Sequence, residues 1–199
     1  MTNFVDLYFD RLHAALENVQ YTRPQGERLD RVAAYDLTLQ LAEKAIERGG
    51  KLMFIGNGGS AAIASHMAID FTKNGQMPAV CFNDGAALTC MGNDFGYEEV
   101  FARQLFFHAR PGDVLFAISS SGASPNILRA AAVARDRDCS VITMSGFKAG
   151  NPLRSLGDVN FYIELSEYGM VEVAHTAMIH AVVDLKLANG SAAAARIQE

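Results

Sequence analysis

The sequence predicts a doubly wound α/β fold on a parallel sheet of five strands. Short apolar runs alternate with segments of helical periodicity along most of the chain, and this alternation is typical of strand–helix–strand units. The clearest unit is residues 51–74, which read as a buried strand, a glycine-rich turn and a helix. Right-handed crossovers place the helices in layers over the sheet. The expected strands are residues 52–55, 78–82, 114–118, 140–144 and 159–163.

Two amphipathic segments precede the first expected strand. Residues 2–20 and 28–48 both have apolar residues at helical spacing, and residues 23–26 interrupt them. A sheet domain does not require these helices, so they either pack on their own domain or form a bundle with another subunit. We favour the bundle. This divides the chain into an oligomerisation extension (1–50), a sheet domain (51–190) and a C-terminal tail (191–199).

The remaining elements follow from the same periodicities. We expect a loop or a short helical turn over residues 83–96 and a helix over 97–109. Another helix runs from the serine-rich turn to about residue 138, and a long helix covers 168–188.

Composition restricts the class of partner. The 199 residues fit one domain, and the formal charge of −5 does not indicate a nucleic-acid or anionic-membrane surface. No apolar run approaches the ~18 residues that a membrane span needs, and the first twenty residues do not resemble a signal peptide. The cysteine number is odd, three, without a C-x-x-C spacing. We therefore expect reduced core thiols and a cytoplasmic protein.

The turn Gly-Asn-Gly-Gly-Ser, residues 56–60, is the first candidate site. Ligands of open α/β sheets bind at the carboxyl ends of the strands, and a helix N-terminus attracts anions. The turn is neither a Walker A loop nor a G-x-G-x-x-G motif, and many such turns bind nothing. A phosphate site and a purely structural turn therefore stay equally open at this point.

A serine cluster after the third strand is the second candidate. Ser119, Ser120, Ser121 and Ser124 lie between this strand and the next helix. Their hydroxyls and the helix N–H groups can surround a phosphate without a cationic side chain. The serines could instead be helix caps, but four of them at one strand end favour an anion site.

Acid–base and metal-binding residue types occur on two helices. His66 and Asp70 are four residues apart and so share one helix face. Glu172 and His180 are eight apart, roughly 12 Å along a helix axis and ~80° around it. A small site that includes both therefore collects residues from several elements, including those of other subunits. We interpret His175, on the apolar stripe of the last helix, as a core residue.

Three motifs together resemble the sugar isomerase (SIS) domain family. They are GNGGSAA at residues 56–62, the block GND-x-GYEEVFARQ from residue 92, and S-x-SG-x-SPN at residues 119–126. The likeness covers almost the whole chain, and within the family the motifs are most similar to those of phosphoheptose isomerases. The resemblance implies a flavodoxin-like parallel sheet and a homotetramer with active sites between subunits.

The resemblance also implies a reaction and a set of site residues. The reaction is interconversion of sedoheptulose 7-phosphate and a heptose 7-phosphate, used for lipopolysaccharide or capsule heptose. A zinc site would comprise His66, Asp70, Glu172 and His180, with Asp70 and His180 also moving protons. The implied substrate contacts are Asn57, Gly58, Gly59, Ser60, Asp94, Ser119, Ser120, Ser121, Ser124 and Glu172.

Two of the four implied metal positions depart from the family pattern. Asp70 stands where the family has Glu, and Glu172 stands where it has Gln. Two imidazoles and two carboxylates remain a suitable set for zinc, iron or manganese. A carboxylate cannot be a tightly bound ligand and a free base at once, so these roles of Asp70 compete. The segment 167–171 also lacks the expected basic residue and Gln-Glu pair.

Aldose–ketose isomerisation through an enediol needs a base at carbon and an acid for the oxygens. We assign the base to Asp70 and its acid partner to His180. One alternative is a non-catalytic SIS protein that binds a phosphosugar or bridges partners such as a replication initiator. Another is an isomerase for a different sugar phosphate. The complete acid–base set favours an enzyme.

Overall fold

The computed structural model describes residues 3–197, with side chains up to residue 190. Its described residues form one seven-stranded sheet in the order β2-β1-β7-β6-β5-β3-β4. The five strands from β7 to β4 are parallel, whereas β1 and β2 add antiparallel at one edge. The strands are β1 Gln20–Thr22, β2 Arg28–Leu29, β3 Leu52–Gly56, β4 Ala79–Cys81, β5 Val114–Ser119, β6 Ser140–Ser145 and β7 Val159–Tyr162.

Helices cover both faces of this sheet. One core cluster joins the sheet to α2, α3 and α7, and the other joins it to α5 and α6. The helices are α1 Phe4–Glu17, α2 Arg31–Glu47, α3 Gly59–Lys73, α4 Gly85–Phe95, α5 Val100–His108, α6 Pro125–Asp136 and α7 Tyr168–Ile197. Short 3-10 turns are η1 Pro24–Gly26, η2 Tyr97–Glu99 and η3 Pro152–Ser155.

The central strands explain why the sequence predicted this class. Every residue of β3 and β5 is buried, because each strand is covered by helices on both faces. Phe54 and Phe116 stack at 4.7 Å on the α3 side, while Met53 and Leu115 belong to the cluster on the α6 side. The predicted doubly wound α/β class is confirmed.

The predicted strand count was wrong, because β1 and β2 lie in the extension. The first helix ends before residue 18, and residues 20–22 form a strand in which Tyr21 pairs with Phe161 of β7. The rings of these two residues meet edge to face, with centroids 5.3 Å apart. The segment 83–96 also differs, since it contains the eleven-residue helix α4. Asp84 caps α4 by accepting a hydrogen bond from the Ala87 N–H. Its glycines and Asn93 have low helix propensity, which hid the helix in the sequence.

The two N-terminal helices differ in how they pack. On α2, Ala34, Leu39 and Ala42 are buried against the sheet domain. On α1, Phe4 and Phe9 are 79% and 62% exposed. The oligomerisation role of the extension stays a prediction.

Three smaller expectations concern the tail, the membrane and the thiols. The segment named as a tail (191–199) continues α7 as far as Ile197, and its side chains and residues 198–199 lie outside the described part. Among the described residues, no helix combines the length and the apolarity that crossing a bilayer requires. Cys139 is buried, but Cys90 is exposed, so the prediction of a core thiol was wrong for Cys90.

Candidate active site

The β3–α3 turn opens the N-terminus of α3. Gly58 has φ of 55°, a left-handed conformation that favours glycine, and its position as N-cap leaves the first turn of α3 without a side-chain cap. A Cβ on Gly56 would lie 2.4 Å from the Ser60 carbonyl oxygen, so the chain needs glycine there too. The first N–H groups of α3 are therefore available to an anion.

The serine turn lies beside this helix end because β5 is the parallel neighbour of β3. Together the two turns enclose a pocket of about 340 Å³. The lining residues are Asn57, Gly58, Gly59, Ser60, Ile118, Ser119, Ser120, Ser121, Ser124, Tyr168 and Glu172. Nine of the ten predicted substrate contacts thus meet in one place.

The hydroxyls of Ser119 and Ser124 face each other rather than capping α6. The Oγ atoms of Ser119 and Ser124 lie 3.3 Å apart, and Ser124 makes no side-chain bond to the helix that it precedes. The Oγ of Ser120 is buried without a hydrogen-bond partner among the described residues. A buried hydroxyl without a partner is costly, and a ligand oxygen would satisfy it.

No lysine or arginine is among the residues that line this pocket. Its positive potential comes from the N-termini of α3 and α6. One charge opposes it, because the carboxylate of Glu172 lies against Gly59. A Cβ on Gly59 would be only 2.3 Å from that carboxylate, so glycine makes room for it.

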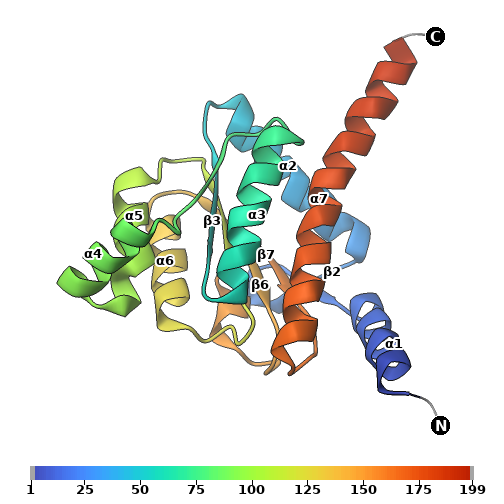
Figure 1. Cartoon of the computed structure of the whole chain (residues 1–199). Helices are drawn as coiled ribbons and strands as arrows, with labels where there is room; N and C mark the ends of the chain where they lie inside the picture. Colours follow the sequence, from blue (N-terminus) through green and yellow to red (C-terminus); the bar gives the residue numbers. More distant parts are fainter. Residues whose placement is uncertain (1–2, 198–199) are drawn as a thin grey trace.

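Two turns further along α3, a second group of polar side chains meets on the same chain. The Nε2 atoms of His66 and His180 are 3.2 Å apart, and His180 Nδ1 lies 3.2 Å from Asp70 Oδ2. Asn74 donates to the other carboxylate oxygen of Asp70 at 2.8 Å. Helices α3 and α7 are side by side in Figure 1, and this packing delivers His180 without a second subunit.

His66, Asp70 and His180 suit a divalent metal. Their candidate ligand atoms all lie within 4.8 Å of one another. Zinc–nitrogen bonds of about 2.05 Å in a tetrahedron put two ligand nitrogens about 3.3 Å apart. The 3.2 Å between the two Nε2 atoms fits that edge.

Two predicted site residues lie elsewhere. Glu172 does not join the His66 group, because α3 and α7 run parallel and Glu172 packs beside Gly59 at their amino ends. Asp94 is exposed on α4, where it accepts a hydrogen bond from Asn93, and it lines neither the pocket nor the histidine group. The predicted role of His175 agrees with its complete burial, which lowers its pKa to about 4.

Three residues around the pocket were not singled out from the sequence. Tyr168 lines it, and Asn126 and Tyr97 hydrogen-bond to Asn57. Asn126 belongs to the serine motif and Tyr97 to the GYEE block, so both stood in motifs that were already recognised. The sequence motifs did not show that these residues contact Asn57.

Comparison with known proteins identifies the family. The SIS domain model matches residues 8–146. Phosphoheptose isomerase of Helicobacter hepaticus is 40% identical over 158 residues, which cover 76% of this chain and 78% of the relative.

Solved structures agree. The phosphoheptose isomerase of Neisseria gonorrhoeae superposes with a TM-score of 0.79 at 31% identity, covering 92% of this chain and 97% of that one. The phosphoheptose isomerase of Francisella tularensis superposes with a TM-score of 0.78 at 26% identity, covering 94% of this chain and 98% of that one. The chain therefore belongs to the SIS-domain family, among the phosphoheptose isomerases.

Proposed function

We propose that this isomerase interconverts sedoheptulose 7-phosphate and a heptose 7-phosphate. The observation that carries the proposal is the position of two different sites along one helix, α3. An anion pocket lies at its N-terminus, and an acid–base group lies at His66 and Asp70. His66 comes seven positions after Gly59, about 10 Å along the axis.

That separation suits a seven-carbon chain. An extended C7 sugar phosphate spans about 10 Å from phosphorus to the C1–C2 end, given carbon–carbon bonds of about 1.5 Å. With the phosphate at the serine turn, the carbons that exchange a proton come close to His180. A heptose phosphate is therefore long enough to reach from the anion pocket to the histidine group.

The residues divide the chemistry between them. The serine hydroxyls and the first N–H groups of α3 bind the phosphate. Asp70 takes the proton from carbon, and His180 exchanges protons with the substrate oxygens. The 3.2 Å between Asp70 Oδ2 and His180 Nδ1 allows a proton to pass between the two residues. A divalent cation, zinc in the first instance, would be held by His66, Asp70 and His180 and would polarise the substrate oxygens. Glu172 and Asp94 remain proposed substrate contacts, and Glu172 would reach the metal only by leaving Gly59.

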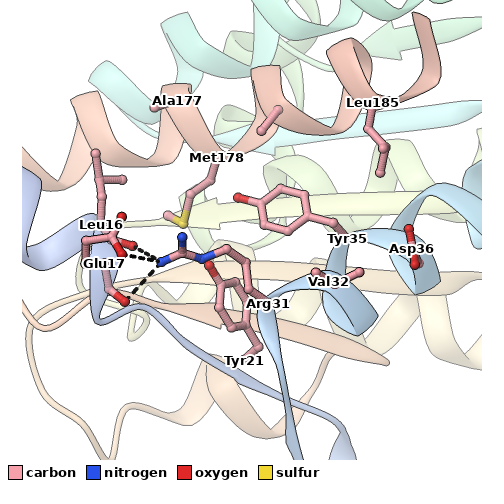
Figure 2. A pocket seen from close by; sticks show the side chains of 11 residues that line it. Leu16, Glu17, Tyr21, Arg31, Val32, Tyr35, Asp36, Ala177, Met178 and Leu185 are labelled. Atoms are coloured by element: carbon pink, nitrogen blue, oxygen red, sulfur yellow. Dashed lines mark hydrogen bonds and ion pairs between the residues drawn. The ribbon is translucent and has the colours of Figure 1, made fainter. Parts of the chain in front are cut away.

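We also propose self-association, as a homotetramer. Next to α1 an apolar groove of about 420 Å³ runs between α2 and α7, and Figure 2 shows Arg31 bonded to Glu17 along it. Phe4 and Phe9 project from α1 without cover. A second copy would bury both features, and the variant Phe9→Asp should lower the molar mass measured by light scattering. The tetramer would work in the cytoplasm, in lipopolysaccharide or capsule heptose synthesis.

The deciding experiment is turnover of a panel of sugar phosphates by the purified protein. We expect isomerisation of sedoheptulose 7-phosphate, and loss of turnover with binding retained in His180→Ala. A panel that is bound but never converted would support the sensor class instead, and faster turnover of another sugar would change the substrate. Turnover that survives chelation would exclude a catalytic metal.

A further inference from the structure

A pair of asparagines joins the two walls of the anion pocket. Asn57 follows β3 in the glycine turn, and Asn126 is the second residue of α6, after the serine turn. Asn57 Nδ2 donates to Asn126 Oδ1 at 2.9 Å, and Asn126 Nδ2 donates to Asn57 Oδ1 at 2.9 Å. This reciprocal amide pair connects segments 69 residues apart. Asn126 is 2% exposed and does not line the pocket.

A tyrosine hydroxyl adds a third hydrogen bond to the pair. Tyr97 Oη donates to Asn57 Oδ1 at 3.1 Å. The turn η2 that carries Tyr97 is tied to α6, because Glu98 forms an ion pair with Arg129 at 2.7 Å. Arg129 and Asn126 are three residues apart and share one face of α6. Helix α6 therefore carries Asn126 and also anchors the turn that carries Tyr97.

Counting donors and acceptors shows what Asn57 can still offer. An amide oxygen has two acceptor positions, and both are used by Asn126 and Tyr97. The amide nitrogen has two hydrogens, and one is used by Asn126. The remaining group is one N–H donor on a residue that lines the pocket. A donor is the group that suits a phosphate oxygen, whereas an exposed amide oxygen would repel it.

We propose that Asn126 and Tyr97 are positioning residues that lock the Asn57 amide with its remaining N–H toward the anion pocket. They act on a bound phosphate only through Asn57. The proposal rests on the proposed function only in taking phosphate as the ligand of this pocket. The buried Asn126 supplies two hydrogen bonds to Asn57, and the exposed Tyr97 supplies one.

The test is a double-mutant cycle read out by calorimetric titration with inorganic phosphate. Asn57→Ala and Asn126→Ala should each weaken phosphate binding by about ten-fold, as expected for loss of one or two hydrogen bonds. Because Asn126 acts through Asn57, the double variant should bind no more weakly than Asn57→Ala. Tyr97→Phe should weaken binding about three-fold alone and not at all in the Asn57→Ala background.

A purely structural role gives a different pattern. The matched control is Asn160→Ala, because Asn160 is another fully buried asparagine with hydrogen-bonded side-chain atoms, on β7. It should lower the melting temperature and leave phosphate affinity unchanged. If Asn126→Ala does not fold, Tyr97→Phe carries the test, since it removes one hydroxyl from a residue that is 64% exposed.

Three results would overturn the proposal: additive losses in the double variant, unchanged affinity in Asn126→Ala, or no phosphate binding by the wild-type protein. Kinetics add an independent check. The KM for the sugar phosphate should rise in Asn126→Ala while kcat stays nearly constant, because the lost contact binds ground state and transition state alike. Failure of the proposed reaction would remove turnover but leave the pattern of phosphate affinities intact.

Discussion

The carboxylate of Glu172 should weaken phosphate binding, and Glu172→Gln should strengthen it. In the structure this carboxylate lies against Gly59, at the first turn of α3, where the positive end of the helix dipole attracts anions. No cationic side chain among the residues that line the pocket neutralises it. A phosphate at the serine turn therefore shares its pocket with another negative charge.

The size of the effect follows from the size of the pocket. A sphere of 340 Å³ is about 9 Å across, so a phosphate in the pocket lies within that distance of the carboxylate, and we take a separation of roughly 7 Å. At an effective dielectric constant of about 20 this separation gives ~2.4 kcal/mol for each unit of phosphate charge. Glu172 is only partly buried, and halving that value for solvent screening leaves about 1 kcal/mol, or a five- to ten-fold change in affinity.

The assay is titration with inorganic phosphate at low ionic strength, repeated at high salt, where the difference should shrink. Gly59→Ala probes the same contact by sterics, since its Cβ would displace the carboxylate while keeping the charge. Glu164→Gln is the control, because Glu164 is exposed and does not line the pocket. Equal or weaker phosphate binding by Glu172→Gln would refute the reasoning. An equal gain in Glu164→Gln would show that only net charge matters.

Three other outcomes test the remaining parts of the structure. Titration of the metal-free protein with zinc tests whether Asp70 orients His180 or binds the ion. If it orients His180, His66→Ala should abolish zinc affinity, whereas Asp70→Asn should lower it only 10- to 100-fold. Equal losses of zinc affinity in the two variants would make Asp70 a direct ligand. The pKa of His175, lowered to about 4 by burial, lies below its unfolded value of about 6.5, so stability should fall by about 2 kcal/mol between pH 7 and 5 in urea unfolding. His175→Leu should lose that acid sensitivity, and an unchanged pH profile would contradict the assignment. Asp113→Ala should lower the free energy of unfolding by about 3 kcal/mol in the same assay, because the buried carboxylate accepts a hydrogen bond from the Lys51 ammonium at 2.5 Å. A decrease of less than about 1 kcal/mol would contradict this.

The fold was predictable to the extent that local patterns decided it. Strands β3 and β5 are buried on both faces, so their sequences are continuous apolar runs that need no tertiary knowledge to recognise. The edge strand β1 has only three residues and exists through its pairing with β7. Nothing within residues 20–22 distinguishes it from the end of a helix, so its pairing partner had to be known first.

The candidate site was predictable motif by motif, but not in its connections. Both anion-binding turns follow strands, and the sequence shows that much. The order of those strands is a property of the whole sheet, and it alone brings Asn57 to Asn126. The assignment of Glu172 and His180 to one site depended on the direction of α7 relative to α3. Their parallel packing places Glu172 at the anion pocket and His180 at the acid–base group.

The same packing bears on the competing roles of Asp70. Both of its carboxylate oxygens already have partners, His180 Nδ1 at 3.2 Å and the Asn74 amide at 2.8 Å. When the carboxylate accepts a hydrogen bond from Nδ1–H of His180, the lone pair on Nε2 of this histidine stays free. Nε2 is the atom that faces His66. Asp70 is therefore already placed to orient an imidazole. To act as the base at carbon it must release one of these partners, and Asn74 is the exposed one. Asp70 thus holds His180 in place in this arrangement, and it can act as the base at carbon once Asn74 releases it.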